Sequence, residues 1–208
     1  TCDINHPLWH HRGIAVEKFY STGPFAVLPY ACGYKSAIVW VHNRITKDVI
    51  NQYTDEEVLL FIKKRLGHYL GDIEVASDIQ TYPLYQMMVP KWFRRRVALV
   101  GDAAHLVHPI AGQGLNLGIK DTDVITNLIN EYMDLGLDIG SSTLLSTYQK
   151  KRYFDVKVMQ MATKGINSIF STNSFVPRYI RRTGLVLLDK IVGIKGQCAK
   201  YASGLYQI

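Results

Sequence analysis

Residues Val97 to Asp121 read VALVGDAAHLVHPIAGQGLNLGIKD, and this stretch decides the fold of the chain. The apolar run Val97–Val100 predicts a short buried strand that stops at Gly101-Asp102. After an irregular segment with one proline, Gly112-Gln113-Gly114 opens a helix. A strand that ends in an acid, followed by a glycine-rich helix start, presents one carboxylate and several unpaired backbone N–H groups to a common crevice. Such a crevice suits a polyol that is attached to an electron-rich group.

Length and composition limit the kind of protein to which this crevice can belong. With 208 residues, 48% of them hydrophobic, the chain can bury a real core in one or two compact units. No apolar run reaches the roughly 18 to 20 residues of a membrane span, and the first residues lack the order of a signal peptide. The three cysteines are widely spaced and form no CxxC pair, which predicts free thiols in a reducing compartment. We therefore expect a cytoplasmic protein.

The net charge of +7 is concentrated near the C-terminus. Residues 1–147 hold 13 Lys and Arg against 15 Asp and Glu, whereas residues 148–208 hold 11 against 2. The basic residues there are interleaved with apolar ones, which suits an anionic membrane surface, an acidic partner or, equally well, the solvated face of a core helix. Because the chain has no nucleic-acid motif and its excess charge is confined to this region, we predict no nucleic-acid binding.

The first ninety residues read mostly as strands separated by Gly and Pro. The runs Ile14–Tyr20, Phe25–Pro29 and Ser36–Val41 predict an antiparallel sheet. Thr54, followed by three acids and by apolar residues at helical spacing, predicts a helix over residues 54–67. Residues 77–88 are expected to return to extended structure, and the proline within them favours an edge or a bulge.

A basic turn at Lys91–Arg96 leads into the opening motif, and we place a domain crossing there. After the glycine-rich helix, Ser142 or Thr143 is expected to cap a long helix that breaks within Phe170–Pro177 and is followed by one or two short helices. The predicted fold class is α/β, of the α+β kind. Its parts are residues 1–92 with the sheet and one helix, 93–135 with the strand, loop and glycine-rich helix, and 136–208 with C-terminal helices.

Several common site chemistries are excluded or disfavoured by spacing. A G-x-G-x-x-G dinucleotide fingerprint that starts at Gly112 needs a third glycine at position 117, where Leu117 stands. His105 and His108 are three residues apart, but no third ligand is near and their neighbours are apolar. This setting favours packed or supporting histidines, and we predict no metal site. Neither a phosphate-cradling G-x-x-x-x-G-K-[ST] loop nor a G-x-S-x-G elbow is present.

The same residues resemble a known family. Four segments resemble the second flavin-binding motif of the FAD-dependent aromatic hydroxylases, the para-hydroxybenzoate hydroxylase-like enzymes: Gly101–His105, Pro109, Gly112–Gly118 and Asp121. Within that group, the run HPIAGQG that begins at His108 resembles the ubiquinone-biosynthesis hydroxylases. Similar stretches at Gly23–Pro29, Tyr82–Leu84 and Tyr148–Arg152 extend the resemblance over nearly the whole chain.

The resemblance implies the C-terminal half of a FAD-dependent monooxygenase. Residues 1–92 then belong to the antiparallel substrate domain, residues 93–135 supply one returning strand and helix of the FAD domain, and C-terminal helices follow. Members of the family are about twice as long, and their N-terminal half carries the strand and glycine-rich loop that bind the ADP part of FAD. We expect this chain to need that half as a partner, and to bind FAD weakly and lack activity alone.

The resemblance also implies roles for individual residues. Asp102 would accept a hydrogen bond from a ribityl hydroxyl, although a cap for the following turn is an alternative role. Pro109 would lie near the reacting face of the flavin, unless it only fixes the loop. An apolar floor for the aromatic substrate would include Phe25, Val27 and Leu28. Backbone N–H groups at a helix start would face the flavin ring. The implied cofactor-binding residues are Gly101, Asp102, Gly112, Gln113, Gly114, Leu115 and Asn116.

Two functions remain open on this reading. The first is hydroxylation of the aromatic ring of a prenylated phenol in ubiquinone biosynthesis, with FAD as cofactor and NAD(P)H and O2 as co-substrates; the flavin carries the oxygen chemistry and the protein orients the reactants. The second is a non-catalytic scaffold or interaction module of a membrane-associated quinone-biosynthesis complex. Either function is compatible with a peripheral position on the inner face of a membrane.

Overall fold

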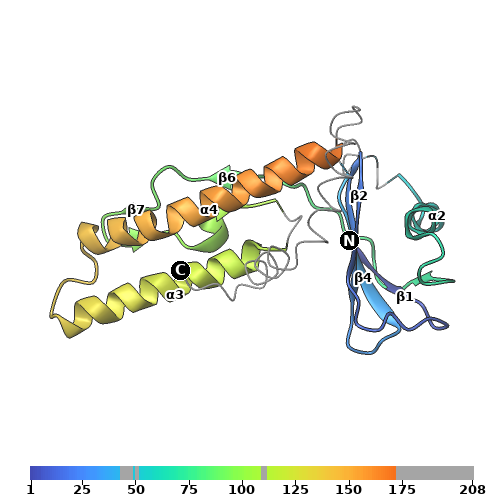
Figure 1. Cartoon of the computed structure of the whole chain (residues 1–208), viewed down its shortest axis with the longest axis horizontal. Coiled ribbons are helices and arrows are strands. Elements are labelled where there is room, and N and C mark those ends of the chain that lie inside the picture. Colours follow the sequence, from blue (N-terminus) through green and yellow to red (C-terminus); the bar gives the residue numbers. More distant parts are fainter. Residues whose placement is uncertain (43–48, 50–51, 109–111, 172–208) are drawn as a thin grey trace, which may run out of the picture. The chain divides into compact units, whose positions relative to one another are not determined.

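The computed structural model describes residues 1–42, 49, 52–108 and 112–171. The chain forms two compact units, residues 1–83 and 84–169 (Figure 1). The division falls before the basic turn at residues 91–96, where the sequence placed the crossing. It falls earlier because Met87 and Met88 already pair with His105 and Leu106 in the second unit.

The first unit is built on the predicted antiparallel sheet, which is confirmed. Its strand order is β2-β3-β4-β1-β5. Three strands lie close to the predicted limits: β2 (Val16–Tyr20), β3 (Gly23–Pro29) and β4 (Lys35–Trp40). The strand β1 (Cys2–Asn5) and the short β5 (Glu74–Val75) were not predicted. All neighbouring strands pair antiparallel. Hairpins join β2, β3 and β4, whereas β1 lies between β4 and β5, so the chain crosses from β1 to β2 at the opposite edge and reaches β5 after a helix.

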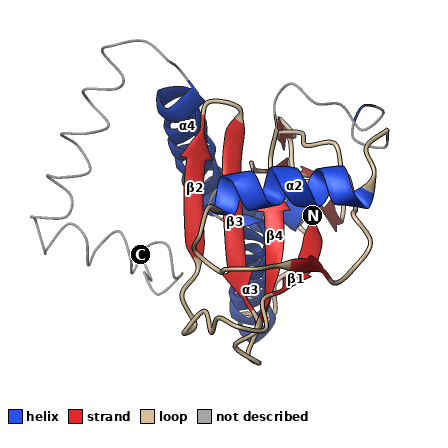
Figure 2. Ribbon diagram, turned by 90° about the vertical axis from the view of Figure 1, so that its right-hand side faces the viewer, coloured by secondary structure: helices blue, strands red, loops and turns tan. Residues whose placement is uncertain are grey.

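Helix α2 (Asp55–Leu66) crosses one face of this sheet (Figure 2). The predicted helix over residues 54–67 is confirmed to within its caps: Thr54 is the N-cap and Gly67 the C-cap. Thr54 Oγ1 accepts from the Glu57 N–H, and the Glu57 carboxylate accepts from the Thr54 N–H at 2.8 Å, which forms a complete capping box. The core between helix and sheet is apolar and includes Ile4, Phe25, Val27, Ile38, Val58, Ile62 and Leu66.

The second unit begins with short paired strands rather than with a long one. β6 (Met87–Met88) pairs with β9 (His105–Leu106), and β7 (Phe93–Arg94) pairs with β8 (Val97–Ala98). The predicted buried strand over residues 97–100 is therefore only half formed, and Val97 is 65% exposed. The physical reason is that a strand needs a ladder partner, and within the described residues this segment finds one only in β7. Of residues 77–88, only β6 forms a strand.

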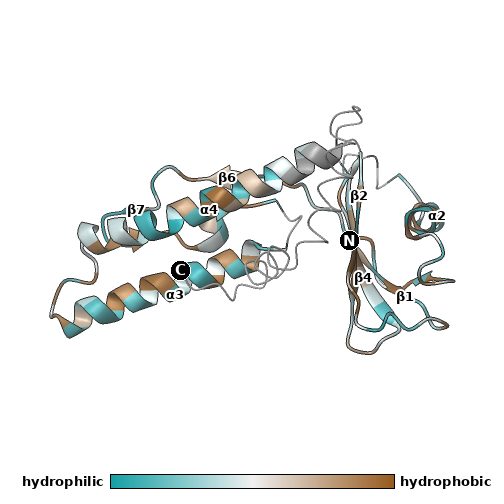
Figure 3. Ribbon diagram, in the orientation of Figure 1, coloured by the Kyte–Doolittle hydropathy of each residue, from teal (hydrophilic) through white to brown (hydrophobic). Residues whose placement is uncertain are grey.

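Two helices, α3 (Gly114–Asp134) and α4 (Ser142–Ser171), run antiparallel and side by side (Figure 1). Apolar and polar residues alternate along both (Figure 3), and their apolar faces share a core that includes Leu117, Leu128, Leu144, Tyr148 and Val156. Both helices position the segment that holds the candidate site.

The N-terminus of α4 differs slightly from the prediction. Ser141 Oγ accepts from the Leu144 N–H at 3.3 Å, so the capping serine is one residue earlier than Ser142 or Thr143. The helix is described as far as Ser171, and a break was expected within residues 170–177; residues 172–177 and the predicted short helices lie outside the described residues. In the part of the chain that is described, no helix is both long and apolar enough to span a bilayer.

Candidate functional site

A tight turn, η1 (Gly101–Ala103), places an exposed carboxylate beside the start of α3. Gly101 adopts φ +60°, a left-handed conformation that favours glycine. A Cβ added to Gly118 would lie 3.5 Å from the Gly101 Cα, so the turn rests closely on the second turn of α3. A Cβ added to Gly114 would lie 3.9 Å from Asp102 Oδ1. The structure therefore brings Asp102 and the first helical residue together, as the opening motif predicted.

Among the described residues, no side chain forms a capping hydrogen bond at the N-terminus of α3. Its N-cap residue, Gln113, makes no capping hydrogen bond, and no acid occupies the first turn. Gln113 Oε1 instead accepts from Asn116 Nδ2 at 3.2 Å. The first N–H groups of a helix have no partner within the helix and carry the positive end of its dipole. Gly112 has φ +59°, and among the described residues no atom lies within 4 Å of a Cβ added there.

These groups fit FAD, the cofactor that the resemblance implies. A ribityl chain offers hydroxyl donors, and Asp102 is an exposed acceptor for them. An electron-rich ring edge needs N–H donors and a positive potential, and the start of α3 supplies both. Leu115 is 75% exposed at this helix start, beside Asn116. Pro109, expected near the reacting face, lies outside the described residues.

A buried charged cluster lies directly behind the turn. Asp121 of α3 is fully buried and accepts three hydrogen bonds: from the Gly101 N–H at 2.9 Å, from His105 Nε2 at 2.6 Å and from Arg152 Nε at 2.7 Å. Arg152 Nη1 also donates to Asp155 at 2.6 Å. We call Asp121, His105 and Arg152 the carboxylate cluster. It links the turn to α3, β9 and α4.

The cluster keeps its carboxylate ionised although it is buried. Burial alone would raise the pKa of Asp121, but the hydrogen bonds from His105, Arg152 and Gly101 lower it below its usual value. Nearby, Tyr148 donates to the Leu99 carbonyl at 3.0 Å and so fastens the segment that enters the turn. Burial, followed by the charge of Asp121, raises the pKa of Tyr148, which therefore stays a hydrogen-bond donor.

The two histidines of the motif have different environments. His105 is buried in the carboxylate cluster, with its ring centroid 5.0 Å from that of Trp92, in the packed setting that its apolar neighbours predicted. His108 is half-buried, and desolvation lowers its pKa. Among the described residues, no three His, Cys, Asp or Glu side chains group in a way that could hold a metal ion.

The three residues expected to form one apolar floor do not share a face. Phe25 and Val27 point from β3 toward α2 and are 0% and 1% exposed, so they belong to the sealed core. Leu28 points to the opposite face of the sheet and is 43% exposed. The physical reason is the two-residue period of a strand, which sends adjacent side chains to opposite faces. Of the three, only Leu28 remains available to a substrate.

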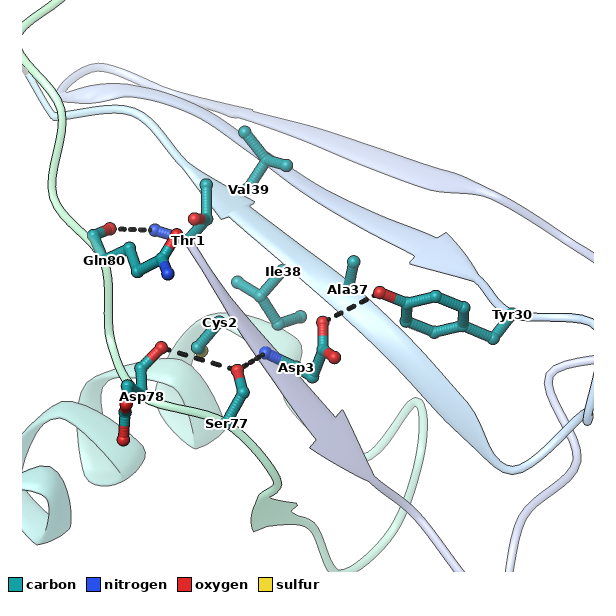
Figure 4. Close-up of a pocket in the computed structure, with 10 residues that line it drawn as sticks. All are labelled: Thr1, Cys2, Asp3, Tyr30, Ala37, Ile38, Val39, Ser77, Asp78 and Gln80. Carbon is teal, nitrogen blue, oxygen red and sulfur yellow. Dashed lines mark hydrogen bonds between the residues drawn. The ribbon is translucent and has the colours of Figure 1, made fainter.

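The first unit also contains a cavity of about 450 Å³ beside β1 and β4 (Figure 4). Its wall is largely polar: Tyr30 Oη donates to Asp3 Oδ1 at 3.1 Å, and Ser77 Oγ accepts from the Asp3 N–H at 2.8 Å. None of the residues that sequence analysis assigned to the site lines this cavity.

The sequence did not reveal the role of Arg152. It lies 31 residues after Asp121, and no local pattern joins the two. The available signal was weak: each charged residue stands four positions before an apolar residue of its predicted helix, Asp121 before Ile125 and Arg152 before Val156, which suggests a buried face but does not identify an ion pair.

Comparisons with known proteins found a matching family and similar sequences. A family model described as "FAD binding domain" matches residues 6–162. Ubiquinone hydroxylase UbiL of Rhodospirillum rubrum is 32% identical over 198 residues, which are 95% of this chain and 46% of that protein. The 3-demethoxyubiquinol 3-hydroxylase of Escherichia coli is 31% identical over 193 residues, 91% of this chain and 48% of that protein.

Solved structures show the same fold. The p-nitrophenol 4-monooxygenase PnpA from Pseudomonas putida superposes with a TM-score of 0.69 at 17% identity, over 98% of this chain and 51% of that one. CabE, an aromatic hydroxylase from angucycline biosynthesis, gives a TM-score of 0.62 at 21% identity over all of this chain and 41% of that one. The chain thus spans about half the length of the curated relatives that it matches.

Proposed function

This chain belongs to the FAD binding domain family, and from that premise we propose that it supplies the flavin-ring half of the FAD site in a monooxygenase. The reaction is hydroxylation of the aromatic ring of a prenylated phenol in ubiquinone biosynthesis, with NAD(P)H and O2 as co-substrates. The names of the relatives support this substrate class, because UbiL is called a ubiquinone hydroxylase and the Escherichia coli relative a 3-demethoxyubiquinol 3-hydroxylase.

The observation that carries the proposal is the pairing of Asp102 with the uncapped start of α3. An added Cβ at Gly114 would stand 3.9 Å from the Asp102 carboxylate, so an acceptor and a set of N–H donors face the same space. A nucleotide pyrophosphate needs donors without a neighbouring carboxylate, since two negative groups would repel. A neutral polyol needs the carboxylate as an acceptor, and a ring that gains negative charge on reduction needs the N–H donors. A ligand that joins the two therefore needs both groups.

Each residue has a defined part in this proposal. Asp102 accepts a hydrogen bond from a ribityl hydroxyl, and Gly101 allows the backbone turn that presents it. The N–H groups from Gly112 to Asn116 hold the pyrimidine edge of the ring and stabilise negative charge there. Bound FAD supplies the activation of oxygen, and the protein supplies orientation and a dry setting. On the substrate side, Leu28 belongs to the open sheet face that contacts the aromatic ring.

The partners in this proposal follow from the length of the match. The relatives contain roughly as many residues outside the match as inside it, and the ADP part of FAD needs a site that the described residues do not offer. A second polypeptide region therefore completes the FAD site. A prenylated phenol is poorly soluble in water, so the complete enzyme works at a membrane surface or within a quinone-biosynthesis complex.

The test compares two proteins by flavin absorbance and by titration with FAD. One is the chain of residues 1–208; the other is the natural polypeptide, by which we mean the whole translation product that carries these residues. We expect the chain alone to bind FAD weakly or not at all and the natural polypeptide to bind it and to oxidise NAD(P)H when a prenylated phenol is added. An Asp102→Ala variant of the natural polypeptide should lose at least tenfold in FAD affinity.

Two outcomes would redirect the proposal. If the natural polypeptide binds FAD but does not oxidise NAD(P)H when any of the tested phenols is added, the scaffold function is favoured. If it binds no FAD, the proposed cofactor site is wrong.

A further inference from the structure

We propose that Asp121 is a positioning residue for the flavin site, which it never touches: its buried carboxylate fixes the backbone of Gly101 and thereby the carboxylate of Asp102. The inference rests on the proposed function, because it concerns the same site. It assigns the cluster a purpose other than stability.

The geometry makes Asp121 the common partner of three separate segments. Its Oδ2 accepts from the Gly101 N–H of the turn and from His105 Nε2 of β9, and its Oδ1 accepts from Arg152 Nε of α4. Asp121 itself stands two helical turns after Gly114 on α3. One carboxylate therefore sets the turn that carries Asp102 relative to the helix whose start forms the other half of the site.

Only an ionised carboxylate can fill this place. All three partners are donors, and they approach both oxygens. An asparagine amide offers one oxygen and one NH2 group, so one side of it would place donor against donor. Either the Gly101 N–H or the Arg152 guanidinium would then lose its acceptor. Since Asp102 is the residue that follows Gly101, a displaced Gly101 carries Asp102 with it.

Stability alone is a poor explanation of the cluster. Buried ion pairs contribute little net stability compared with apolar side chains of the same size, because both charges must leave water. The cluster is also incompletely satisfied: among the described residues, the buried His105 Nδ1 and Arg152 Nη2 have no hydrogen-bond partner. What the arrangement does supply is direction, since hydrogen bonds fix orientation whereas apolar contacts leave it adaptable.

The experiment uses the natural polypeptide and compares Asp121→Asn with Leu128→Ala. Leu128 is buried on the same helix, two turns beyond Asp121, and its truncation destabilises the same core without contacting the turn. Two quantities are measured for each variant: the dissociation constant for FAD, and the amide hydrogen exchange of the peptide that spans residues 99–105.

We expect Asp121→Asn to weaken FAD binding at least tenfold and to speed exchange in residues 99–105. Leu128→Ala should change the FAD dissociation constant less than threefold and leave the exchange of that peptide unchanged relative to the rest of the unit. Equal FAD affinities in the two variants at matched thermal stability would overturn the proposal, because a merely structural residue behaves in that way.

A second variant keeps the test decisive if Asp121→Asn fails to fold. Asp121→Glu keeps the charge and both acceptor oxygens but lengthens the side chain by one methylene, which must displace the turn in a packed site. It should fold and still lose at least fivefold in FAD affinity; full affinity would contradict a positioning role. If the wild-type polypeptide binds no FAD, the proposed function fails, and hydrogen exchange alone then decides whether Asp121 holds the turn.

Discussion

The N-termini of α2 and α3 are built in opposite ways. At α2, Thr54 and Glu57 form a reciprocal capping box, and three acids, Asp55, Glu56 and Glu57, occupy the first turn. At α3, the N-cap residue makes no capping bond, the first turn contains no acid, and glycines stand at positions 112 and 114. Both helices have the same unpaired N–H groups and the same dipole. Only α2 satisfies them from its own side chains.

The difference separates a structural helix start from one that we propose binds a ligand. A capped, acidic helix start stabilises the fold and leaves nothing for a ligand, whereas an uncapped one keeps donors and positive potential available. At α3 the carboxylate of Asp102 lies nearby, and in the function that we propose it accepts from hydroxyl groups of the ligand. The start of α3 thus gives up capping stability that the start of α2 keeps.

The largest effect should come from giving α3 the acid that α2 has. Leu115→Glu places a carboxylate in the first turn, at an exposed position, where it favours the helix by about 0.3 to 1 kcal/mol. The same charge repels an electron-rich ring edge. We expect unfolding of the natural polypeptide to be no easier and FAD affinity to fall at least tenfold, about 1.4 kcal/mol, in a titration that follows flavin fluorescence.

Leu115→Gln is the matched control, because glutamine has the same shape without the charge. It should bind FAD within threefold of the wild type. Equal losses in both variants would mean that shape rather than charge matters at this position, and the electrostatic part of the comparison would fail.

A smaller effect is expected from removing the cap that α2 has. Thr54→Ala deletes the hydroxyl that accepts from the Glu57 N–H, so the free energy of unfolding should fall by about 1 kcal/mol. FAD affinity should stay unchanged, since α2 belongs to the other unit. Urea denaturation measures the first quantity and the flavin titration the second. Thr54→Ser, which keeps a hydroxyl, should recover most of the stability; a loss of FAD binding in Thr54→Ala would contradict the assignment of α2 as purely structural.

The same two helix starts illustrate how far the sequence could predict the structure. The limits of α2 depend on residues close together in the sequence, Thr54 with Glu57 at one end and Gly67 at the other. Such local signals can be recognised without knowing the fold. The turn at Gly101 and the helix start at Gly114 were likewise predicted from glycine and acid spacing. Features that depend on distant partners were predicted less well.

Three residues illustrate the part that the sequence left open. Val97 was expected inside a buried strand. Strand pairing depends on which other strand the fold places beside it, and Val97 lies exposed in a short hairpin with β7. Leu28 and its neighbours are all apolar, so hydropathy could not tell which face of β3 meets α2. Arg152 contacts Asp121 across 31 residues, and such a contact arises only when α3 and α4 pack together.

The smallest expected effect concerns pH and the segment that leads into α3. Desolvation lowers the pKa of His108, so the folded chain favours the neutral imidazole. Between the folded pKa and the ordinary value of about 6.5, the unfolded chain binds more protons than the folded one. Stability therefore rises with pH across this window and is lost as pH falls below about 6.5, until the folded pKa is passed. The start of α2 has no histidine in its cap or first turn.

His108→Gln removes this titration and keeps a polar side chain of similar length. We expect the urea midpoint of the natural polypeptide to fall between pH 7.5 and pH 5.5, and to fall less in the variant. Asp121 should not contribute in this range: its pKa is lowered, so the stability that depends on its charge is present above about pH 3.9 and is lost only as pH falls through the lower folded value. The same pH dependence in wild type and variant would show that folding does not lower the pKa of His108. The two helix starts would then differ in capping and charge but not in their response to acid.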